Sequence, residues 1–455
     1  MHLSNPSTPA FSQAGIIDRP LTTAVAAAEC RVPSLSSALQ PPLVFGAATL
    51  TTAAMHGAGL PALCALVQRA GAEPAGLIYD TGLVHQIAFR PDEARRFQAA
   101  ALDSSSLFRV RRATLARVQG KPLSRTPVAN APCPGTSGPA PVRVLALMSP
   151  GDLMANTPLD FVTNHLDVQL DLLFMRPGQA LPETVPEHDV MICASSEPDP
   201  ATLDAMSRLY QAWPRPVLNN PACLPLLARD RLPAVLGDIP GLLCPATAVV
   251  AREGLEAAGG GRVALEDVAA CGGFPVLVRP VGSHAGIGLE KVEGPDALAA
   301  YLRRTPDAQF YVTEFVDYGG ADGLFRKYRV GFIEGEAFLC HMAASEHWMV
   351  HYLNAGMAES PAKRALEAEA MAGFDAGFGA RHAAAFRALH AALGFDFYSL
   401  DCGELPDGRL LVFEADQAAI IHLMDPVDLF PYKHVQMRRV FTAFEAMLRR
   451  RTGLR

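Results

Sequence analysis

The sequence predicts a protein of the α/β and α+β classes, in which a doubly wound layer precedes a set of antiparallel hairpins. Residues 142–149 are an apolar run bounded by turn signals, and a second such strand lies within 188–198 and ends at Ser195 and Ser196; both are typical of buried parallel strands. A helical pattern over 200–213 and a short strand at 216–218 come next, and this alternation indicates a doubly wound layer. Further along, the Pro-Asp-Gly sequence at 406–408 joins two strand patterns into a hairpin.

The N-terminal third of the chain predicts three successive segments. Residues 1–45 are rich in Ser, Thr, Pro and Ala without a clear period, so we expect them to be disordered. Helical patterns within 46–120 predict a small helical leader. Residues 121–141 are rich in Pro, Ser and Gly, and they predict a linker. Because few contacts usually cross such a segment, we expect the leader to fold separately from residues 142–455.

The composition narrows the class of protein. Half of the 455 residues are hydrophobic, the net charge is −7, and the nine cysteines lack metal-ligand spacing. An acidic chain has little general attraction to nucleic acid, and scattered cysteines in odd number indicate reduced thiols. No apolar run reaches membrane-spanning length, and no signal peptide is evident. We therefore expect a cytoplasmic protein with neither nucleic-acid nor membrane partners.

Three carboxylates of the C-terminal hairpin form the first candidate site. Asp401 lies on the first strand, while Glu414 and Asp416 lie on the second. Side chains two residues apart on a strand share a face, and the hairpin can bring Asp401 beside them. Three oxygen ligands suit Mg²⁺, which typically binds one or two carboxylates together with water and phosphate. The alternative is a hairpin whose acidic side chains are merely solvated.

A loop of small residues upstream forms the second candidate site. Pro275–Arg279 is an apolar strand pattern that ends in a cation, and a second strand pattern begins at Leu289. Small residues allow backbone N–H groups to approach an anion, as in phosphate-binding loops. The loop is neither a Walker loop nor a Rossmann fingerprint, because Gly-Lys-Ser/Thr is missing and a strand comes next. The loop residues concerned are Gly282, Ser283, His284, Gly286 and Gly288.

Two further features flank these motifs. Arg329 lies inside an apolar strand pattern, where it needs an anion, unless it faces outward on an edge strand. The segment 345–357 carries His347 and His351 at a helical spacing, but the order is not that of a zinc protease. It predicts either a lid over a site or an amphipathic helix.

Ligands gather at the carboxyl ends of strands in doubly wound sheets, so Ser149 and Ser195 are candidate substrate residues.

The ordered set of motifs resembles the ATP-grasp superfamily, specifically the glutathione-synthetase and RimK-like carboxylate–amine ligases. The resemblance covers about residues 142–448 and implies an ATP-grasp fold behind a pre-ATP-grasp domain. It implies that 142–220 is that preceding domain, 221–310 the N-lobe and 311–455 the C-lobe with the metal site. Arginines stand where the family has its two nucleotide lysines, and Asp416 stands where it has asparagine.

The resemblance also implies a role for each candidate residue. Arg329 would neutralise the transferred phosphoryl group, and Asn354 would lie near the phosphates. His347 and His351 would belong to the acceptor side. The implied metal ligands are Asp401, Glu414 and Asp416. The implied nucleotide residues are Arg231, Arg279, the glycine loop and the hinge residues Glu314, Phe315 and Val316.

The implied function is an ATP-dependent ligase that joins a carboxylate to an amine, or less often a thiol, through an acyl phosphate. ATP and Mg²⁺ are the implied cofactors, with Mn²⁺ as an alternative metal. The substrates would be small molecules or peptides, and a homodimer is one option for the assembly. A regulatory or scaffold protein with a decayed ligase site is the alternative function, and the two lysine-to-arginine departures favour it.

Overall fold

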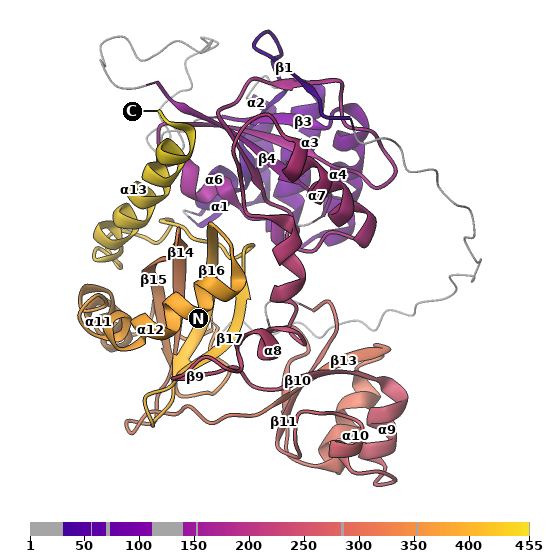
Figure 1. Ribbon diagram of the computed structural model, residues 1–455, viewed down its shortest axis with the longest axis vertical. Helices are drawn as coiled ribbons and strands as arrows, with labels where there is room; N and C mark the ends of the chain where they lie inside the picture. Colours follow the sequence, from indigo (N-terminus) through magenta and orange to yellow (C-terminus); the bar gives the residue numbers. More distant parts are fainter. Residues whose placement is uncertain are drawn as a thin grey trace.

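The computed structural model describes residues 31–55, 57–69, 73–111, 140–151, 153–283, 286–351 and 354–454. Within them the chain forms sheets of six, five and four strands and a two-stranded pair. Figure 1 shows the six-stranded sheet at one end of the long axis and the four-stranded sheet at the other. The expectations for 1–30, for most of the linker and for His284 lie outside the described residues. No described helix is both long and apolar enough to cross a membrane.

The six-stranded sheet confirms the doubly wound layer. Its order is β2-β3-β5-β4-β7-β8, and the last four of these strands run parallel. β3 is antiparallel to β5 and parallel to β2. Helix α7 covers one face, while α1 to α4 and α13 cover the other. The bounds are Leu43–Val44 (β2), Leu107–Val110 (β3), Val142–Met148 (β4), Val168–Phe174 (β5), Val190–Cys193 (β7), Val217–Leu218 (β8) and Pro200–Ala212 (α7).

The region expected to be a separate leader is part of this layer. β2 and β3 extend the sheet, and Arg109 of β3 makes two hydrogen bonds to Asp171 of β5, at 2.6 and 2.9 Å, with both side chains buried. β1 (Ser34–Ser36) pairs with β6 (Thr184–Pro186). The expected disorder is therefore wrong for these strands, which are too short to show an alternating pattern. The helices are α1 (Gly46–Met55), α2 (Leu60–Arg69), α3 (Pro74–Ile87) and α4 (Pro91–Ser104).

The four-stranded sheet is antiparallel throughout, in the order β10-β13-β11-β12. Helices α9 and α10 share a hydrophobic core with it. The glycine loop joins β11 to β12, as expected from the sequence. The bounds are Thr247–Ala251 (β10), Val276–Pro280 (β11), Glu290–Val292 (β12), Gln309–Glu314 (β13), Arg252–Gly259 (α9) and Pro295–Arg304 (α10).

The five-stranded sheet has the order β15-β14-β16-β17-β9 and contains both predicted hairpins. All neighbours are antiparallel except β17 and β9. Alternate residues of its strands pack against helices α11 and α12 in one core. The bounds are Leu242–Leu243 (β9), Phe325–Ile333 (β14), Glu336–Ser345 (β15), Phe397–Glu404 (β16), Leu410–Asp416 (β17), Pro361–Ala372 (α11) and Phe378–Leu393 (α12).

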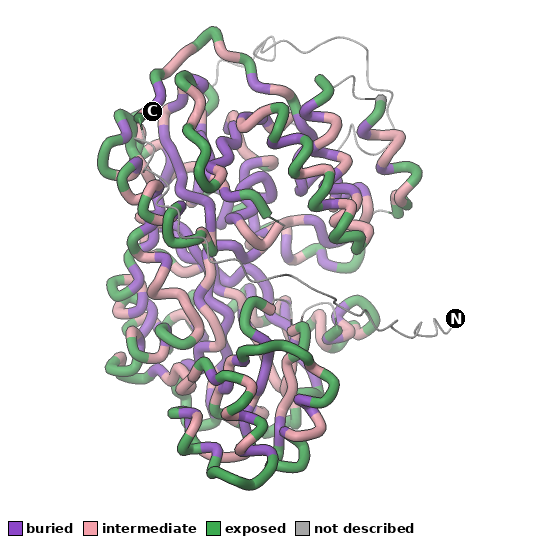
Figure 2. The backbone as a smooth tube through the Cα atoms, turned by 90° about the vertical axis from the view of Figure 1, so that its right-hand side faces the viewer, coloured by how far each residue is buried: buried purple, intermediate pink, exposed green. Residues whose placement is uncertain are grey.

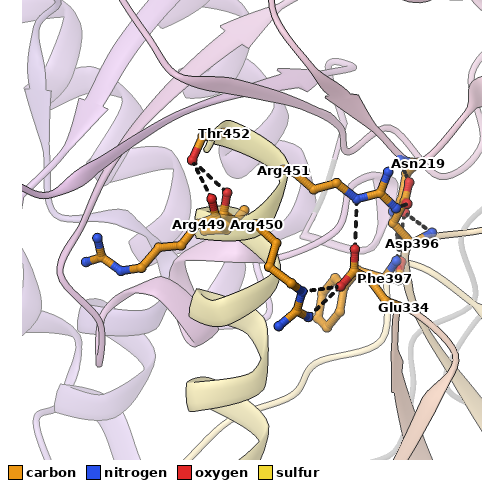
Figure 3. Close-up of polar contacts among 9 residues, drawn as sticks. Asn219, Glu334, Asp396, Phe397, Arg449, Arg450, Arg451 and Thr452 are labelled. Atoms are coloured by element: carbon orange, nitrogen blue, oxygen red, sulfur yellow. Dashed lines mark hydrogen bonds and ion pairs between the residues drawn. The ribbon is translucent and has the colours of Figure 1, made fainter. Parts of the chain in front are cut away.

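Helix α13 (Lys433–Thr452) joins the two larger sheets, since its apolar side chains share a core with strands of both. In Figure 3, Arg450 and Arg451 reach from its last turn to Glu334, and Arg451 also reaches Asp396. Glu334 lies in the turn between β14 and β15, while Asp396 precedes β16. Figure 2 shows that buried backbone runs through the middle of the molecule, with exposed segments around it.

Candidate active site

One row of directly opposed residues crosses four strands of the five-stranded sheet. His341 on β15 is opposite Arg329 on β14, which is opposite Asp401 on β16, which is opposite Glu414 on β17. Directly opposed side chains share a face of the sheet. Alternate residues such as Val330 pack toward α11 and α12, so the charged row lies on the other face. The row therefore gathers an imidazole, a guanidinium and two carboxylates at one level of the sheet.

Asp401 is the buried centre of this row, with 2% of its surface exposed. Arg329 donates to both carboxylate oxygens, from Nε at 2.7 Å and from Nη2 at 2.9 Å. Lys327 Nζ donates to Oδ2 at 2.8 Å. Burial opposes ionisation, but the attraction of Arg329 and Lys327 outweighs it and holds the pKa of Asp401 well below its usual value. Sequence reasoning missed Lys327, although its spacing of two residues from Arg329 places both on one face.

Glu414 and Asp416 are adjacent to this centre but differ in their partners. Arg229 Nη2 lies 2.6 Å from Glu414 Oε2. Burial raises the pKa of Glu414, but the attraction of Arg229 outweighs it, and the net shift is downward. Asp416 accepts a hydrogen bond from the Ala418 N–H at 2.7 Å, and burial and the charge of Glu414 raise its pKa to about 6. Glu414 thus has a cation as its direct partner, whereas Asp416 has a backbone N–H.

Arg231 was expected to contact the nucleotide, but Arg229 is the arginine that reaches the carboxylates of the sheet. Arg231 is exposed at the start of α8 (Leu232–Leu236), whereas Arg229, two residues earlier, pairs with Glu414. Both arginines lie in one short stretch of sequence, and sequence alone does not choose between them. Arg229 also lies close to Arg279, because its charge contributes to the lowered pKa of that residue.

The predicted three-carboxylate metal site does not assemble in the described part of the chain, where no three His, Cys, Asp or Glu side chains are grouped to hold a metal. The reason is that Arg329 and Lys327 already donate to the oxygens of Asp401. Glu414 and Asp416 still fit Mg²⁺, since two carboxylates suffice when water and phosphate complete the shell. Burial and the charge of Glu414 raise the pKa of Asp416, and a divalent cation would favour its ionised form.

Arg279 holds the glycine loop at its root. Its Nε donates to Ser283 Oγ at 3.0 Å, and Ser283 Oγ donates to the Pro280 carbonyl at 2.8 Å. Burial and the charge of Arg229 lower the pKa of Arg279 to about 10. Gly288 has φ of 68°, and a Cβ there would lie 2.7 Å from Pro280 Cδ, so only glycine fits. Gly282 and Gly286 also have positive φ, of 77° and 74°.

The hinge residues lie at and just after the end of β13 in the four-stranded sheet. Glu314 ends β13 and is exposed, while Val316 is half-buried. The ring of Phe315 meets the ring of Trp348 edge-on, with centroids 5.8 Å apart. Lys291 Nζ lies 4.0 Å from the centroid of the Phe315 ring. The segment between the two smaller sheets therefore offers an aromatic side chain with a cation beside it.

The segment 345–357 crosses from the hinge toward the charged row, and its described part consists of bends and turns rather than a helix. The Tyr318 hydroxyl donates to the Trp348 carbonyl at 2.6 Å. The helical spacing of His347 and His351 therefore does not place the two side chains on one helix face. His347 is exposed. Burial and the charges of Lys327 and Arg329 lower the pKa of His351, which places it near these cations.

Asn354 and the histidine of the row differ in how they relate to the charged residues. Asn354 is exposed, and its Oδ1 accepts from the His351 N–H at 3.0 Å, which closes a turn. Its expected place near the phosphates stays a prediction. His341, which sequence reasoning missed, is buried within the row itself. Burial and the charge of Arg329 hold its pKa well below the usual value.

Ser149 and Ser195 meet at the carboxyl ends of β4 and β7, with their Oγ atoms 2.6 Å apart. The strand order reverses between these two strands, and ligands of doubly wound sheets bind at such a point. Asn156 Oδ1 accepts from the Ser149 N–H, and its Nδ2 donates to the Ser149 carbonyl, both at 2.8 Å. Gln417, directly after Asp416, donates to the Ser195 carbonyl. The serine pair is thus tied to the end of the carboxylate hairpin.

Comparison with known proteins gives likenesses of structure only. No protein-family model and no curated protein matches the sequence. The chain is similar to a RimK-domain ATP-grasp protein from Sphaerobacter thermophilus DSM 20745, with 18% identity, a TM-score of 0.35, and coverage of 68% of this chain and 99% of that one. At such low values of both measures, the likeness carries no argument about activity.

Two further solved structures are similar at the same level. One is a D-alanine–D-alanine ligase from Bacillus anthracis complexed with ATP, with 14% identity, a TM-score of 0.36, and coverage of 66% of this chain and 98% of that one. The other is D-alanyl-alanine synthetase A from Vibrio cholerae O1 biovar eltor str. N16961, with 10% identity, a TM-score of 0.41, and coverage of 69% and 99%.

Proposed function

We propose that this protein is an ATP-dependent carboxylate–amine ligase of the ATP-grasp type, which works through an acyl phosphate. The row of His341, Arg329, Asp401 and Glu414 is the observation that carries the proposal. Phosphoryl transfer needs positioning and charge neutralisation more than a protein nucleophile. A buried array of fixed cations beside two carboxylates suits that requirement.

The proposed nucleotide site lies between the four-stranded and five-stranded sheets. Arg279, the glycine loop and Arg229 would hold the phosphates, because they join two cations to a loop of small residues. The hinge residues Glu314, Phe315 and Val316 would meet the adenine and ribose. Glu414 and Asp416 would hold Mg²⁺, which when bound neutralises phosphate charge. Asp401 would keep the cations of the row in place.

The proposed chemistry proceeds in two steps. A carboxylate oxygen of the first substrate attacks the terminal phosphorus of ATP, the bond to the bridging oxygen breaks, and ADP leaves. The nitrogen of an amine then attacks the acyl carbon, the bond to the phosphate oxygen breaks, and the amine loses a proton. Arg329 would neutralise the phosphoryl group in the first step. The segment 345–357 would exclude water from the acyl phosphate.

The first substrate would bind near Ser149 and Ser195. Their hydroxyl groups meet at the reversal of strand order, and Gln417 connects them to the proposed metal pair. Small molecules and peptides with a free carboxylate are the substrate class that this arrangement suits. His347 and His351 would lie on the side of the amine, since His351 is near enough to Lys327 and Arg329 for their charges to lower its pKa.

The test is to trap the acyl phosphate with hydroxylamine. Purified protein is incubated with ATP, Mg²⁺, hydroxylamine and pooled carboxylic acids, and hydroxamates are detected by mass spectrometry. We expect hydroxamate and ADP in equal amounts with the native protein and neither with Glu414→Gln. Binding of Mg-ATP without hydroxamate or ADP from any pool would instead support the nucleotide-binding regulatory protein. Failure to bind nucleotide at all would contradict both functions.

A further inference from the structure

Lys327 is a second cation on the same buried carboxylate as Arg329. Its Nζ lies 2.8 Å from Asp401 Oδ2, and Arg329 Nη2 lies 2.9 Å from the same oxygen. Two positive charges therefore lie against one buried carboxylate. Asp401 thus holds both cations in fixed positions next to Glu414 in the row.

The ammonium group of Lys327 has donors to spare. It carries three N–H donors, and within the described residues one of them is used in the hydrogen bond to Asp401. The side chains of Lys327 and Arg329 are 15% and 19% exposed, whereas that of Asp401 is 2% exposed. The carboxylate is thus more deeply buried than the two cations, each of which keeps part of its side chain exposed.

The position of the cation pair indicates which anion it takes. Asp401 is directly opposite Glu414, the proposed metal ligand, and Arg229 reaches Glu414 from the side of Arg279. Mg²⁺ held by Glu414 and Asp416 would neutralise phosphate charge beside the two cations. On the proposed function, the anion that Lys327 and Arg329 would meet there is the terminal phosphate. A carboxylate of the first substrate would approach from the serine pair, across Gln417.

We propose that Lys327 and Arg329, both fixed by Asp401, bind the terminal phosphate of the nucleotide together, with Lys327 as an additional catalytic residue. This inference rests on the proposed function. Because the two cations are held before the nucleotide arrives, little reorganisation is needed when charge develops on the phosphoryl group. Lys327 should therefore distinguish nucleoside triphosphate from nucleoside diphosphate.

The neighbouring Arg326 provides a matched control. It is one residue earlier on the same strand and so faces the opposite side of the sheet. There it pairs with Asp322, with Nη1 3.1 Å from Oδ1. Arg326→Gln removes one positive charge from the same strand without touching the row. Lys327→Gln removes the charge from the row, and Lys327→Arg keeps it.

The experiment compares the dissociation constants of ADP and of a non-hydrolysable ATP analogue, each with Mg²⁺, by calorimetry. For Lys327→Gln we expect the analogue to bind about tenfold more weakly or worse, as for loss of a charged hydrogen bond, while ADP binding stays nearly unchanged. Lys327→Arg should restore most of the preference, and Arg326→Gln should keep it in full. Should Lys327→Gln fail to fold, Lys327→Met is the second neutral variant, with an unbranched stem.

Three results would overturn the inference. The first is equal weakening of ADP and analogue, which would make Lys327 a general electrostatic contact. The second is no change in either. The third is unchanged nucleotide binding with a raised KM for the carboxylic acid in the hydroxamate assay, which would assign Lys327 to the substrate carboxylate. If the native protein binds neither nucleotide, the proposed function itself fails, and that outcome is distinct from these three.

Discussion

Two pairs of carboxylates in this protein are stabilised in opposite ways. Asp401 and Glu414 have cations as partners, and their pKa values are lowered. Asp80 and Asp160 instead accept backbone hydrogen bonds at the start of α1, from Phe45 at 2.8 Å and Ala48 at 2.7 Å respectively. Burial raises the pKa of Asp80 to about 7 and that of Asp160 to about 6.

The difference separates a site built for charge from a site built for folding. Backbone donors at a helix start satisfy a carboxylate in either protonation state, which is enough to fix a helix. Guanidinium and ammonium partners keep the carboxylate ionised and hold fixed positive charges beside it. By this criterion Asp401 and Glu414 belong to the charged row, and Asp80 and Asp160 belong to the junction between α1 and the six-stranded sheet; a role of the row in chemistry is the proposal tested below.

Removal of residues 31–139 should have the largest effect. It removes α1 and Asp80, and it leaves Asp160 without the hydrogen bond from the Ala48 N–H. A fragment of residues 140–455 lacks β2, β3 and α1 to α4, together with the Arg109 partner of buried Asp171. Breaking a buried pair costs roughly 3–5 kcal/mol, and a large apolar face is exposed as well. We expect an aggregated fragment in size-exclusion chromatography.

The control for that experiment is residues 31–455, which keep every element of the six-stranded sheet and should remain soluble. A monomeric fragment of residues 140–455 that is stabilised by Mg-ATP would show that the N-terminal region is dispensable. That result would restore the separable leader expected from the linker sequence.

Glu414→Gln should have the next largest effect, on turnover rather than on folding. The substitution removes the charge that faces Arg229 and the proposed metal, and losses of such electrostatic groups cost on the order of 10²-fold or more in kcat. The measurement is ADP formation in the hydroxamate assay, with melting temperature as the check on folding. Asp407→Asn, in the exposed turn of the same hairpin, is the matched control and should be fully active. Native turnover in Glu414→Gln would remove the row from the chemistry.

Asp80→Asn should change the pH dependence of stability in a direction opposite to that of the charged row. The pKa of Asp80 is raised in the folded state, so the folded protein binds a proton more readily than the unfolded chain. Its contribution is fully present below its ordinary pKa of 3.8 and is lost as the pH rises through about 7.

The measurement for this prediction is the free energy of urea unfolding at several pH values between about 5 and 8. The stability of Asp80→Asn relative to the native protein should rise across this range, because asparagine cannot ionise. Asp199→Asn, at the exposed start of α7, is the control, since its pKa is lowered instead. A constant difference between Asp80→Asn and the native protein would contradict the raised pKa.

Arg451→Ala should have the smallest effect, since its ion pairs are largely exposed. Arg451 Nε donates to Glu334 at 2.8 Å, and the same side chain reaches Asp396. Exposed pairs contribute about 0–1 kcal/mol each, so we expect a loss of about 1 kcal/mol or less in urea unfolding. Arg439 is on the same helix as Arg451 and makes one ion pair, with Asp375. Arg439→Ala should therefore lose less free energy of unfolding than Arg451→Ala. An equal loss in both variants would show that the second contact of Arg451 is not important.

Local pattern predicted those parts of the molecule whose structure depends on near neighbours in sequence. The carboxylate hairpin, the glycine loop and the paired serines at two strand ends follow from alternation, turn residues and strand order. Arg329 was predictable because a charge within an apolar strand needs a partner.

The features that sequence could not predict depend on register and on distant partners. Arg229 reaches Glu414 and Arg231 does not. Which of the two arginines does so depends on the path of the chain before α8. His341 joins the row only through the pairing of β14 with β15, which shifts by one residue after Arg329. β2 has two residues, too few to show a period, so the leader seemed separate.

The hydrogen bonds of Gln417 connect two of the three large sheets. Gln417 donates to Ser195, and Asn219 donates to Gln417 at 3.3 Å and to Phe397 at 2.8 Å, so the doubly wound layer and the five-stranded sheet are fastened together. Among the described residues, no such side-chain bond fastens the four-stranded sheet to either, and this sheet protrudes at the far end of Figure 1. A change in the spacing between the sheets would therefore leave the serine pair and the carboxylate hairpin together and would displace the glycine loop relative to both.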